Sequence, residues 1–174
     1  PGLYRRFPRN ARGSALYVAG ALVAAQRLAE LAWARRNLAR LRARGAIEFG
    51  ASHYPLIVGL HAAWLAAMVL FIPSDAEPHR VLLALYLLLQ PLRYWAIASL
   101  GEFWTTRVII VPGAVPVRSG PYRFLRHPNY LVVAIEIPLL PAAFGAWMMA
   151  AVFGVLNLAL IAYRIGVERA ARPD

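Results

Sequence analysis

The chain has 174 residues, 60% of them hydrophobic, and a formal net charge of +11. Ordinary soluble domains hold about 45–50% apolar residues, so this composition indicates a membrane protein. All 19 basic residues are arginine and they flank apolar runs, which favours membrane lipids over nucleic acid as their partner. Because the chain has no cysteine and no paired histidine spacing, we expect no disulfide, no thiolate nucleophile and no metal centre.

Five apolar stretches approach the length of about 20 residues that a membrane-crossing helix needs. The first continues as an amphipathic, arginine-rich helix that leaves the bilayer and ends at Gly45. Since it has no small-residue cleavage site, we interpret it as a retained span rather than a signal peptide. We therefore predict an all-α, polytopic bundle of about five transmembrane spans. The predicted spans are Ser14–Trp33, Tyr54–Ile72, Arg80–Leu100, Tyr130–Phe144 and Ala146–Ile165.

The last two spans are joined only by about Gly145, which predicts a tight helical hairpin. The fourth span is short and contains Pro138 and Pro141, so we expect it to be kinked or locally unwound. Carbonyl groups freed inside a bilayer need protein or a cavity beside them, which predicts a cavity next to this span. We treat residues 1–100 as a three-span bundle and residues 101–174 as a loop plus hairpin, within one integrated domain.

Arginines concentrate in the connections 34–53 and 101–129 and at the C-terminus. The positive-inside rule places these segments in the cytoplasm and the N-terminus outside. The connection 101–129 is long and punctuated by glycine and proline, and long loops in compact domains are usually functional. We expect an integral protein of a bacterial inner membrane, with its C-terminus and active site in the cytoplasm.

The segment before the fourth span has the sequence SGPYRFLRHPNY. Pro128 suits the first turn of a helix, so the span begins there with His127 as its cap. A helix N-terminus binds anions through its free N–H groups, and Arg123 and Arg126 strengthen this site. For the arginines alone a basic interfacial anchor is the favoured explanation, but it leaves the histidine, the asparagine and the rigid prolines unexplained.

Glu136 lies inside an apolar run, where a carboxylate costs about 2.5–3.5 kcal/mol on insertion scales. It is either a structural partner for Arg93 or a group that binds substrate or transfers a proton, and both alternatives place it inside the bundle. Arg164 and Glu168 are four residues apart on one helical face, which by itself indicates a modest surface pair. We expect His61 to be a hydrogen-bonded packing residue rather than a ligand.

Together these residues resemble the isoprenylcysteine carboxyl methyltransferase family of integral membrane methyltransferases. The family pattern joins Ser/Thr-Gly-x-Tyr, Arg-His-Pro-x-Tyr, a helical hairpin and a final Arg-x-x-x-Glu, and it matches over about Gly101–Arg169. Leu131 stands where the family usually has glycine, and Arg169 where it has a second acid. The run WTTR…GPYRFLRHPNYLVV is similar to a bacterial branch whose members methylate phenolic lipids such as alkylresorcinols.

The resemblance implies that S-adenosylmethionine binds at the cytoplasmic end of the hairpin and leaves as S-adenosylhomocysteine. Glu168 is implied to bind a polar end of the cofactor, and Arg164 to face the substrate. For a phenolic acceptor, Glu136 or His127 is a candidate base, while Arg107 or Arg164 is a candidate stabiliser of the phenolate. The residues implied to bind the cofactor are Val115, Val117, Tyr122, His127, Pro128, Asn129, Tyr130 and Glu168.

The acceptor implied is a lipophilic small molecule that enters sideways from the bilayer, beside the fourth span. A phenol has a pKa near about 10, so its methylation calls for a base or a cation. A prenyl carboxylate and a phospholipid amine are alternative acceptors. A non-enzymatic membrane scaffold or lipid-binding protein also explains the composition, whereas a transporter calls for inverted repeats that the sequence lacks.

Overall fold

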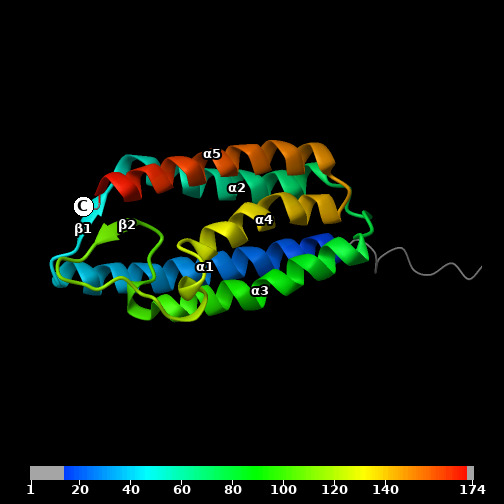
Figure 1. The fold of residues 1–174 in the computed structure, drawn as a ribbon. Helices are drawn as coiled ribbons and strands as arrows, with labels where there is room; N and C mark the ends of the chain where they lie inside the picture. The colour runs from blue at the N-terminus through cyan, green and yellow to red at the C-terminus, as the bar shows by residue number, and fades with distance from the viewer. Residues whose placement is uncertain (1–13, 172–174) are drawn as a thin grey trace, which may run out of the picture.

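The computed structural model describes residues 14–171, so residues 1–13 of the predicted N-terminal bundle lie outside the described part. Within it, five α-helices run alongside one another (Figure 1). Four of them are long and apolar enough to cross a membrane, and α4 is shorter. The predicted all-α membrane bundle is therefore confirmed. The helices are α1 (Ser14–Ala43), α2 (Tyr54–Phe71), α3 (Arg80–Leu100), α4 (Pro128–Ala143) and α5 (Trp147–Ala171).

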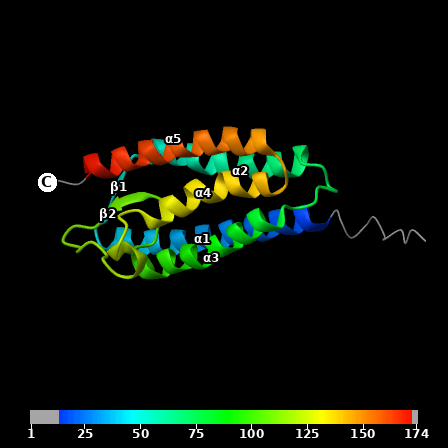
Figure 2. The same ribbon diagram turned by 45° about the vertical axis from the view of Figure 1, so that its right-hand side comes forward.

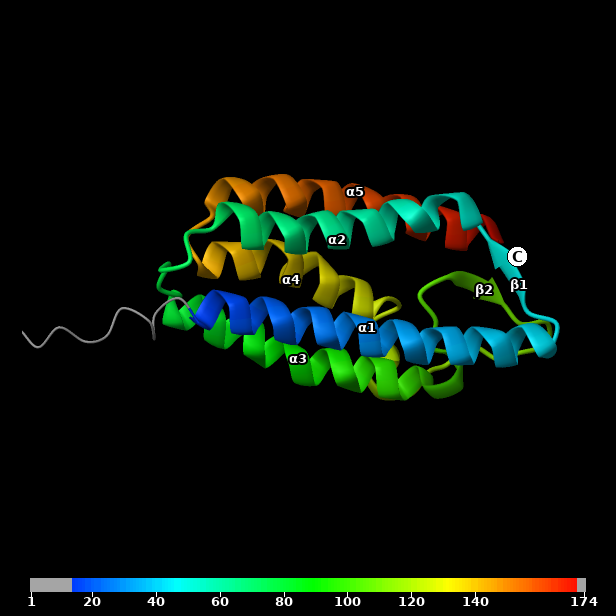
Figure 3. The same ribbon diagram turned by 180° about the vertical axis from the view of Figure 1, so that it is seen from behind.

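The α1–α2 connection and the long α3–α4 connection lie at one end of the bundle, which we call the loop end (Figure 3). Two short strands, β1 (Ile47–Phe49) and β2 (Val108–Ile110), pair there as an antiparallel ribbon, with Glu48 opposite Ile109. Sequence analysis did not predict these strands, because each has only three residues and no alternating pattern. The ribbon ties the α1–α2 connection to the long loop that leads to α4.

Helix α4 lies between two layers, with α2 and α5 on one side and α1 and α3 on the other (Figure 2). Val132, Ile137 and Leu140 on this helix are fully buried. Trp64 and Met68 of α2 pack in the same core cluster as Ile137 and Leu140. A helix that neighbouring helices surround in this way does not need the full length of a membrane-crossing segment.

The two prolines of α4 do not unwind it. The helix is continuous through Pro138 and Pro141, so the predicted locally unwound turn is absent from the described structure. Pro138 instead packs against α5 at Gly154, where an added Cβ would lie 3.2 Å from Pro138 Cβ. Pro138 therefore lies where α4 and α5 approach closely, and the cavity described below lies beside the N-terminal half of α4.

The tight hairpin between α4 and α5 is present. Gly145 has a φ of +77°, and its N–H donates to Ala142 O at 3.0 Å. The Ala146 N–H then donates to Pro141 O at 3.0 Å, so the last carbonyls of α4 are capped by the turn itself. The hairpin returns α5 along α4 and brings Arg164 and Glu168 back to the loop end.

Gly120 is the point at which the loop docks on α3. Its φ is +55°, and an added Cβ would lie 3.0 Å from Trp95 Nε1 and would overlap the Ser99 side chain. The short 3-10 helix Gly120–Arg123 can therefore lie directly on α3 only with glycine at this position. This contact holds Tyr122 at the cavity wall.

We expect Gly120→Ala to destabilise the protein more than Gly113→Ala, which is the matched control. Gly113 also has a positive φ, +74°, but nothing lies within 4 Å of an added Cβ. Both variants place alanine at a positive φ, which costs about 1–2 kcal/mol. Only Gly120→Ala adds the cost of a steric clash, about 1–3 kcal/mol. Thermal unfolding in detergent measures the difference, and equal midpoints would contradict the docking contact.

Candidate active site

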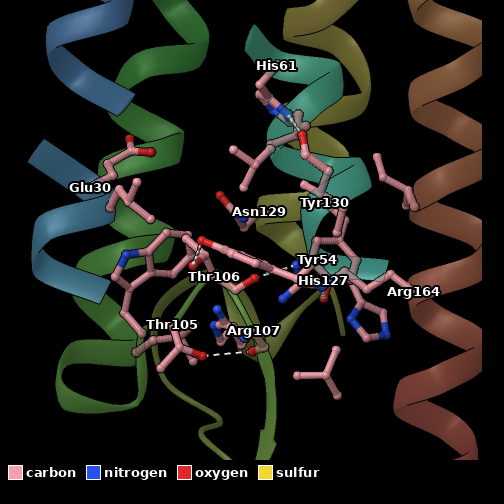
Figure 4. A pocket seen from close by; sticks show the side chains of 18 of the residues that line it. Glu30, Tyr54, His61, Thr105, Thr106, Arg107, His127, Asn129, Tyr130 and Arg164 are labelled. Carbon is pink, nitrogen blue, oxygen red and sulfur yellow. Dashed lines mark hydrogen bonds between the residues drawn. The ribbon is translucent and has the colours of Figure 1, made fainter. Parts of the chain in front are cut away.

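A cavity of about 610 Å³ lies between the two helix layers at the loop end (Figure 4). All five helices contribute to its wall, together with residues 103–110 of the long loop and five later loop residues, Pro116, Val117, Tyr122, Arg126 and His127. The polar side chains that line the cavity fall into two groups. One group surrounds the loop end of the cavity, and the other closes its deep end near the middle of the bundle.

Tyr130 is the centre of the group at the loop end. Its hydroxyl accepts a hydrogen bond from Arg164 Nε at 2.5 Å and donates one to Glu168 Oε1. The His127 ring stacks on the Tyr130 ring, with centroids 5.1 Å apart and planes 2° apart. Glu168 Oε2 lies 3.4 Å from His127 Nδ1, so a single carboxylate links the start of α4 to the end of α5.

Tyr122 and Asn129 complete this group at the loop end. Burial raises the pKa of the Tyr122 hydroxyl above its usual range, and the charge of Glu168 adds to the effect, so this hydroxyl remains a hydrogen-bond donor. Asn129 Oδ1 is a buried acceptor with no hydrogen-bond partner within residues 14–171. Both side chains line the cavity, which therefore offers a donor and an unsatisfied acceptor to a ligand.

Thr106 and Arg107, which come directly before β2, line the opposite wall of the cavity. Arg164 Nη1 donates to Thr106 O at 2.8 Å, and the Thr106 hydroxyl donates to the Tyr54 hydroxyl at 3.3 Å. The Arg107 guanidinium lies 4.1 Å from the centroid of the Tyr54 ring. These contacts fix Arg107, Arg164 and the Tyr54 ring around the same space.

Glu48 on β1 anchors Arg107. Its carboxylate pairs with Arg107 Nη1 and accepts from Arg42 Nη2 at 2.6 Å. Although partial burial raises the pKa of Glu48, the hydrogen bonds from the two arginines are stronger in sum and hold this pKa below its usual range. The ribbon therefore positions Arg107, a charged side chain of the cavity wall.

The depressed pKa predicts a loss of stability in acid. A carboxylate whose pKa is lower in the folded state stabilises the fold above the unfolded pKa of about 4.3, and this contribution is lost as the pH falls through the folded value. Glu48→Gln removes the titration, so we expect a flatter dependence of the unfolding midpoint on pH below about 4. Thermal unfolding of the wild type and of Glu48→Gln between about pH 7 and about pH 3 tests this expectation. Unfolding midpoints that fall in parallel for the two proteins would contradict it.

A buried ionic cluster closes the deep end of the cavity. Arg93 donates to both oxygens of Glu30, from Nε at 2.6 Å and from Nη2 at 2.5 Å. Its Nη1 lies 2.9 Å from Glu136 Oε2, which also accepts from Arg27 Nη2 at 2.8 Å. Gln90 Nε2 donates to the other Glu136 oxygen at 2.8 Å. Both carboxylates are thus paired, and Glu136 is the structural partner of Arg93 that the sequence offered as one alternative.

Residues 82–171, just over half of the chain, match the model of the isoprenylcysteine carboxyl methyltransferase (ICMT) family. The chain belongs to this family. It is 39% identical over 152 residues to "Uncharacterized protein YpbQ" of Bacillus subtilis, covering 85% of this chain and 90% of that one. An uncharacterized protein of Haemophilus influenzae is 27% identical over 156 residues, covering 87% of this chain and 91% of that one. No solved structure matches the chain.

ICMT family membership makes this chain a membrane methyltransferase. The matched region includes α4, α5 and the loop that precedes them, and it therefore contains the whole group around Tyr130. The cavity supplies what such an enzyme needs, because it combines a polar, aromatic end with apolar walls inside the bundle.

The structure brings most of the predicted site residues of this ICMT family member to one cavity. Val115 is not among them, since it is 83% exposed and lies outside the wall, and Pro128 is buried in the first turn of α4. Glu136 is fully buried and does not line the cavity. The roles assigned to all of them stay predictions. The predicted residues that line the cavity are Arg107, Val117, Tyr122, His127, Asn129, Tyr130, Arg164 and Glu168.

Several cavity residues were not predicted. Tyr54 and Thr106 reach the site through contacts between distant segments, which no local pattern marks. Arg27 and Glu30 carried a usable signal, because both are charged residues in the first apolar run. The argument applied to Glu136 also holds for them: a charge inside a span is kept where it is paired or functional.

Proposed function

We propose that this ICMT family protein is an S-adenosylmethionine-dependent enzyme that O-methylates a phenolic lipid taken from the membrane. The observation that carries the proposal is the continuous cavity of about 610 Å³, which joins the group around Tyr130 to an apolar interior. A polar donor molecule and a lipophilic acceptor can meet in such a cavity from opposite directions.

The side walls support entry of a lipid from the bilayer. Leu28 of α1 and Val58 of α2 line the cavity, and they are 67% and 43% exposed. This favours an opening between α1 and α2, rather than the gap beside α4 that we expected from its prolines. An acceptor with a long apolar chain can leave that chain in the lipid while its head group occupies the cavity.

The residues at the loop end fit S-adenosylmethionine. Asn129 Oδ1, the unsatisfied buried acceptor, suits an amino group of the cofactor. The Glu168 carboxylate suits its cationic end, and the Tyr122 ring suits the adenine ring or the sulfonium. When bound, this cofactor supplies an electrophilic methyl group on sulfur.

The chain also supplies the groups that a phenolic acceptor requires. O-methylation replaces the hydroxyl proton, so a base must take that proton from an acceptor with a pKa near about 10. His127 lines the cavity and its ring is held against Tyr130 and Glu168, whereas Glu136 is enclosed by the deep cluster. His127 is therefore the better candidate base. Arg107 and Arg164 are fixed on the wall and stabilise the phenolate.

The membrane orientation follows from charge. The loop end carries the arginine-rich connections, and we propose that it faces the cytoplasm of a bacterium, where the cofactor is made. Helix α5 ends at the same end of the bundle (Figure 1). A reporter that is active only in the cytoplasm should therefore be active when it is fused to the C-terminus.

Mass spectrometry of lipids from cells with and without this protein tests the function. We expect a phenolic lipid that gains one methyl ether when the protein is present and accumulates as the free phenol when it is absent. A methylated phospholipid amine or a prenyl methyl ester would overturn the acceptor assignment. An unchanged lipid profile in cells that make the phenolic lipid would overturn the enzymatic proposal.

A further inference from the structure

A second cavity, of about 290 Å³, lies at the loop end between α1, the start of α2 and the long loop. It shares part of its wall with the candidate active site, because Tyr54 and residues 105–107 line both cavities (Figure 4). Its other lining residues come from one face of α1, which the proposed methyl transfer does not use. They are Ala34, Arg35, Leu38, Ala39 and Arg42.

Positive charge dominates the second cavity. The arginines Arg35, Arg42 and Arg107 line it, and among the described residues no acidic side chain does. Glu48 pairs with Arg42 and Arg107, whereas Arg35 makes no ion pair within residues 14–171. One carboxylate therefore balances three guanidinium groups, and a bound anion would reduce the repulsion among them.

The same arginines have unused hydrogen-bond donors. Each guanidinium carries five N–H groups, and the bonds to the carboxylate use only Nη2 of Arg42 and Nη1 of Arg107. The guanidinium of Arg35 donates to no described residue. The Tyr54 hydroxyl accepts a hydrogen bond from the loop, and its own hydrogen has no acceptor in the described part of the chain. Guanidinium and hydroxyl donors around one space suit the oxygens of a phosphate group.

Ala39 leaves room between two of these arginines. Arg35 and Arg42 are seven residues apart, which is about 10 Å along the axis of α1. Ala39 lies between them on the same face, and its small side chain is exposed. The cavity is thus open at the point where both guanidinium groups can hold one phosphate.

Exposed aromatic side chains indicate that this level of the bundle is the membrane interface. Tryptophan and tyrosine concentrate where the hydrocarbon core meets the lipid head groups. Trp33 directly precedes the α1 face of the second cavity, and Trp95 of α3 lies beside Gly120 of the long loop. Tyr163 of α5 directly precedes Arg164. All three aromatic side chains are exposed, so the second cavity lies at the depth of the lipid phosphates.

An apolar surface continues from the second cavity toward the middle of the bundle. Leu28 lies seven residues before Arg35 on the same face of α1, about 10 Å deeper, and it is exposed. A lipid whose head group occupies the cavity can lay an acyl chain over Leu28, whereas free phosphate gains nothing from this surface. A cationic site followed by an apolar surface matches the order of head group and chain in a phospholipid.

We propose that the second cavity binds the phosphate group of an anionic phospholipid from the surrounding membrane. This lipid lies beside the candidate active site and is not the methyl acceptor. Phosphatidylglycerol has the required chemistry, because the phosphate is the only charged group of its head group. Phosphatidylcholine carries an ammonium group next to its phosphate, which the uncompensated arginines repel. The inference is independent of the proposed methyl transfer, since binding of the lipid is measured without turnover.

The test titrates the full-length protein in a non-ionic detergent with phosphatidylglycerol and with phosphatidylcholine of the same chain length. Native mass spectrometry counts the bound lipid and gives a Kd for each. We expect phosphatidylglycerol to bind at least about 10-fold more tightly. Inorganic phosphate at the same concentration should not displace it, because phosphate has no acyl chain. Equal affinity for the two lipids, or complete displacement by inorganic phosphate, would overturn the proposal.

Two variants of α1 assign the binding to the second cavity. Arg35→Gln should weaken the binding of phosphatidylglycerol about 10-fold, and Ala39→Leu should abolish it by filling the space. Both positions are exposed, so neither change disturbs the core. Arg36→Gln and Ala43→Leu are the matched controls, because they change exposed residues of α1 that line neither cavity, and both should bind as the wild type does.

The controls separate a defined site from a general attraction between lipid and charge. An equal loss of affinity in Arg35→Gln and Arg36→Gln would overturn the site, because net charge alone would then explain the binding. Unchanged affinity in both Arg35→Gln and Ala39→Leu would overturn it as well.

Discussion

Glu168→Ala should lower the affinity for S-adenosylmethionine by at least about 100-fold, since hydrogen bonds to a charged group contribute about 1.5–3 kcal/mol each. The carboxylate accepts from Tyr130 and lies 3.4 Å from His127 and 3.5 Å from Arg164. Its loss therefore releases three side chains at the loop end of the cavity. Isothermal titration calorimetry with the cofactor and with S-adenosylhomocysteine measures the effect.

Glu102→Ala is the control for this variant. Glu102 pairs with Arg44 at 2.9 Å on the exposed surface, so its removal changes the same charge without touching the cavity. We expect its affinity to equal that of the wild type, and we expect His127→Ala to resemble Glu168→Ala. Unchanged affinity in both Glu168→Ala and His127→Ala would contradict the assignment of the loop end to the cofactor.

Arg93→Met should destabilise the folded protein by about 3–5 kcal/mol, the usual cost of breaking a buried pair from one side. Arg93 is only 4% exposed and neutralises both Glu30 and Glu136. Without it, Arg27 is the only cation left in the cluster to balance two buried carboxylates. Unfolding in mixed detergent micelles measures the change in free energy.

Arg44→Met provides the matched comparison for the cluster. Its pair with Glu102 is about half exposed on both sides, so we expect a loss of no more than about 1 kcal/mol. Similar losses of unfolding free energy for Arg93→Met and Arg44→Met would contradict this prediction. They would show that the deep cluster stabilises the fold no more than a surface pair does.

Local sequence signals were sufficient for most of the helices. Pro128 correctly predicted the start of α4, and the apolar run Arg80–Leu100 has the same bounds as α3. The short connection at Gly145 correctly predicted the hairpin. In each case the signal lies within a few residues of the feature, as a proline, a glycine or the length of an apolar run.

Long-range pairing could not be predicted in this way. Glu30 lies within the predicted first span, but no local signal indicates that it pairs with Arg93, which is 63 residues away. The β1–β2 ribbon is too short to show a strand pattern, and the pair between Glu48 and Arg107 beside it joins residues 59 positions apart. The prolines of α4 predicted a kinked or locally unwound span, and the unwound alternative is wrong because α4 is continuous through both of them.

Transfer of a labelled methyl group by the purified protein tests the central claim most directly. The protein is reconstituted in lipid nanodiscs with methyl-labelled S-adenosylmethionine and a long-chain phenolic lipid. We predict that the label appears as a methyl ether on the lipid with the wild type and with Glu102→Ala, and that Glu168→Ala transfers none. Binding of the cofactor by the wild type without any label on the phenolic lipid would contradict the account.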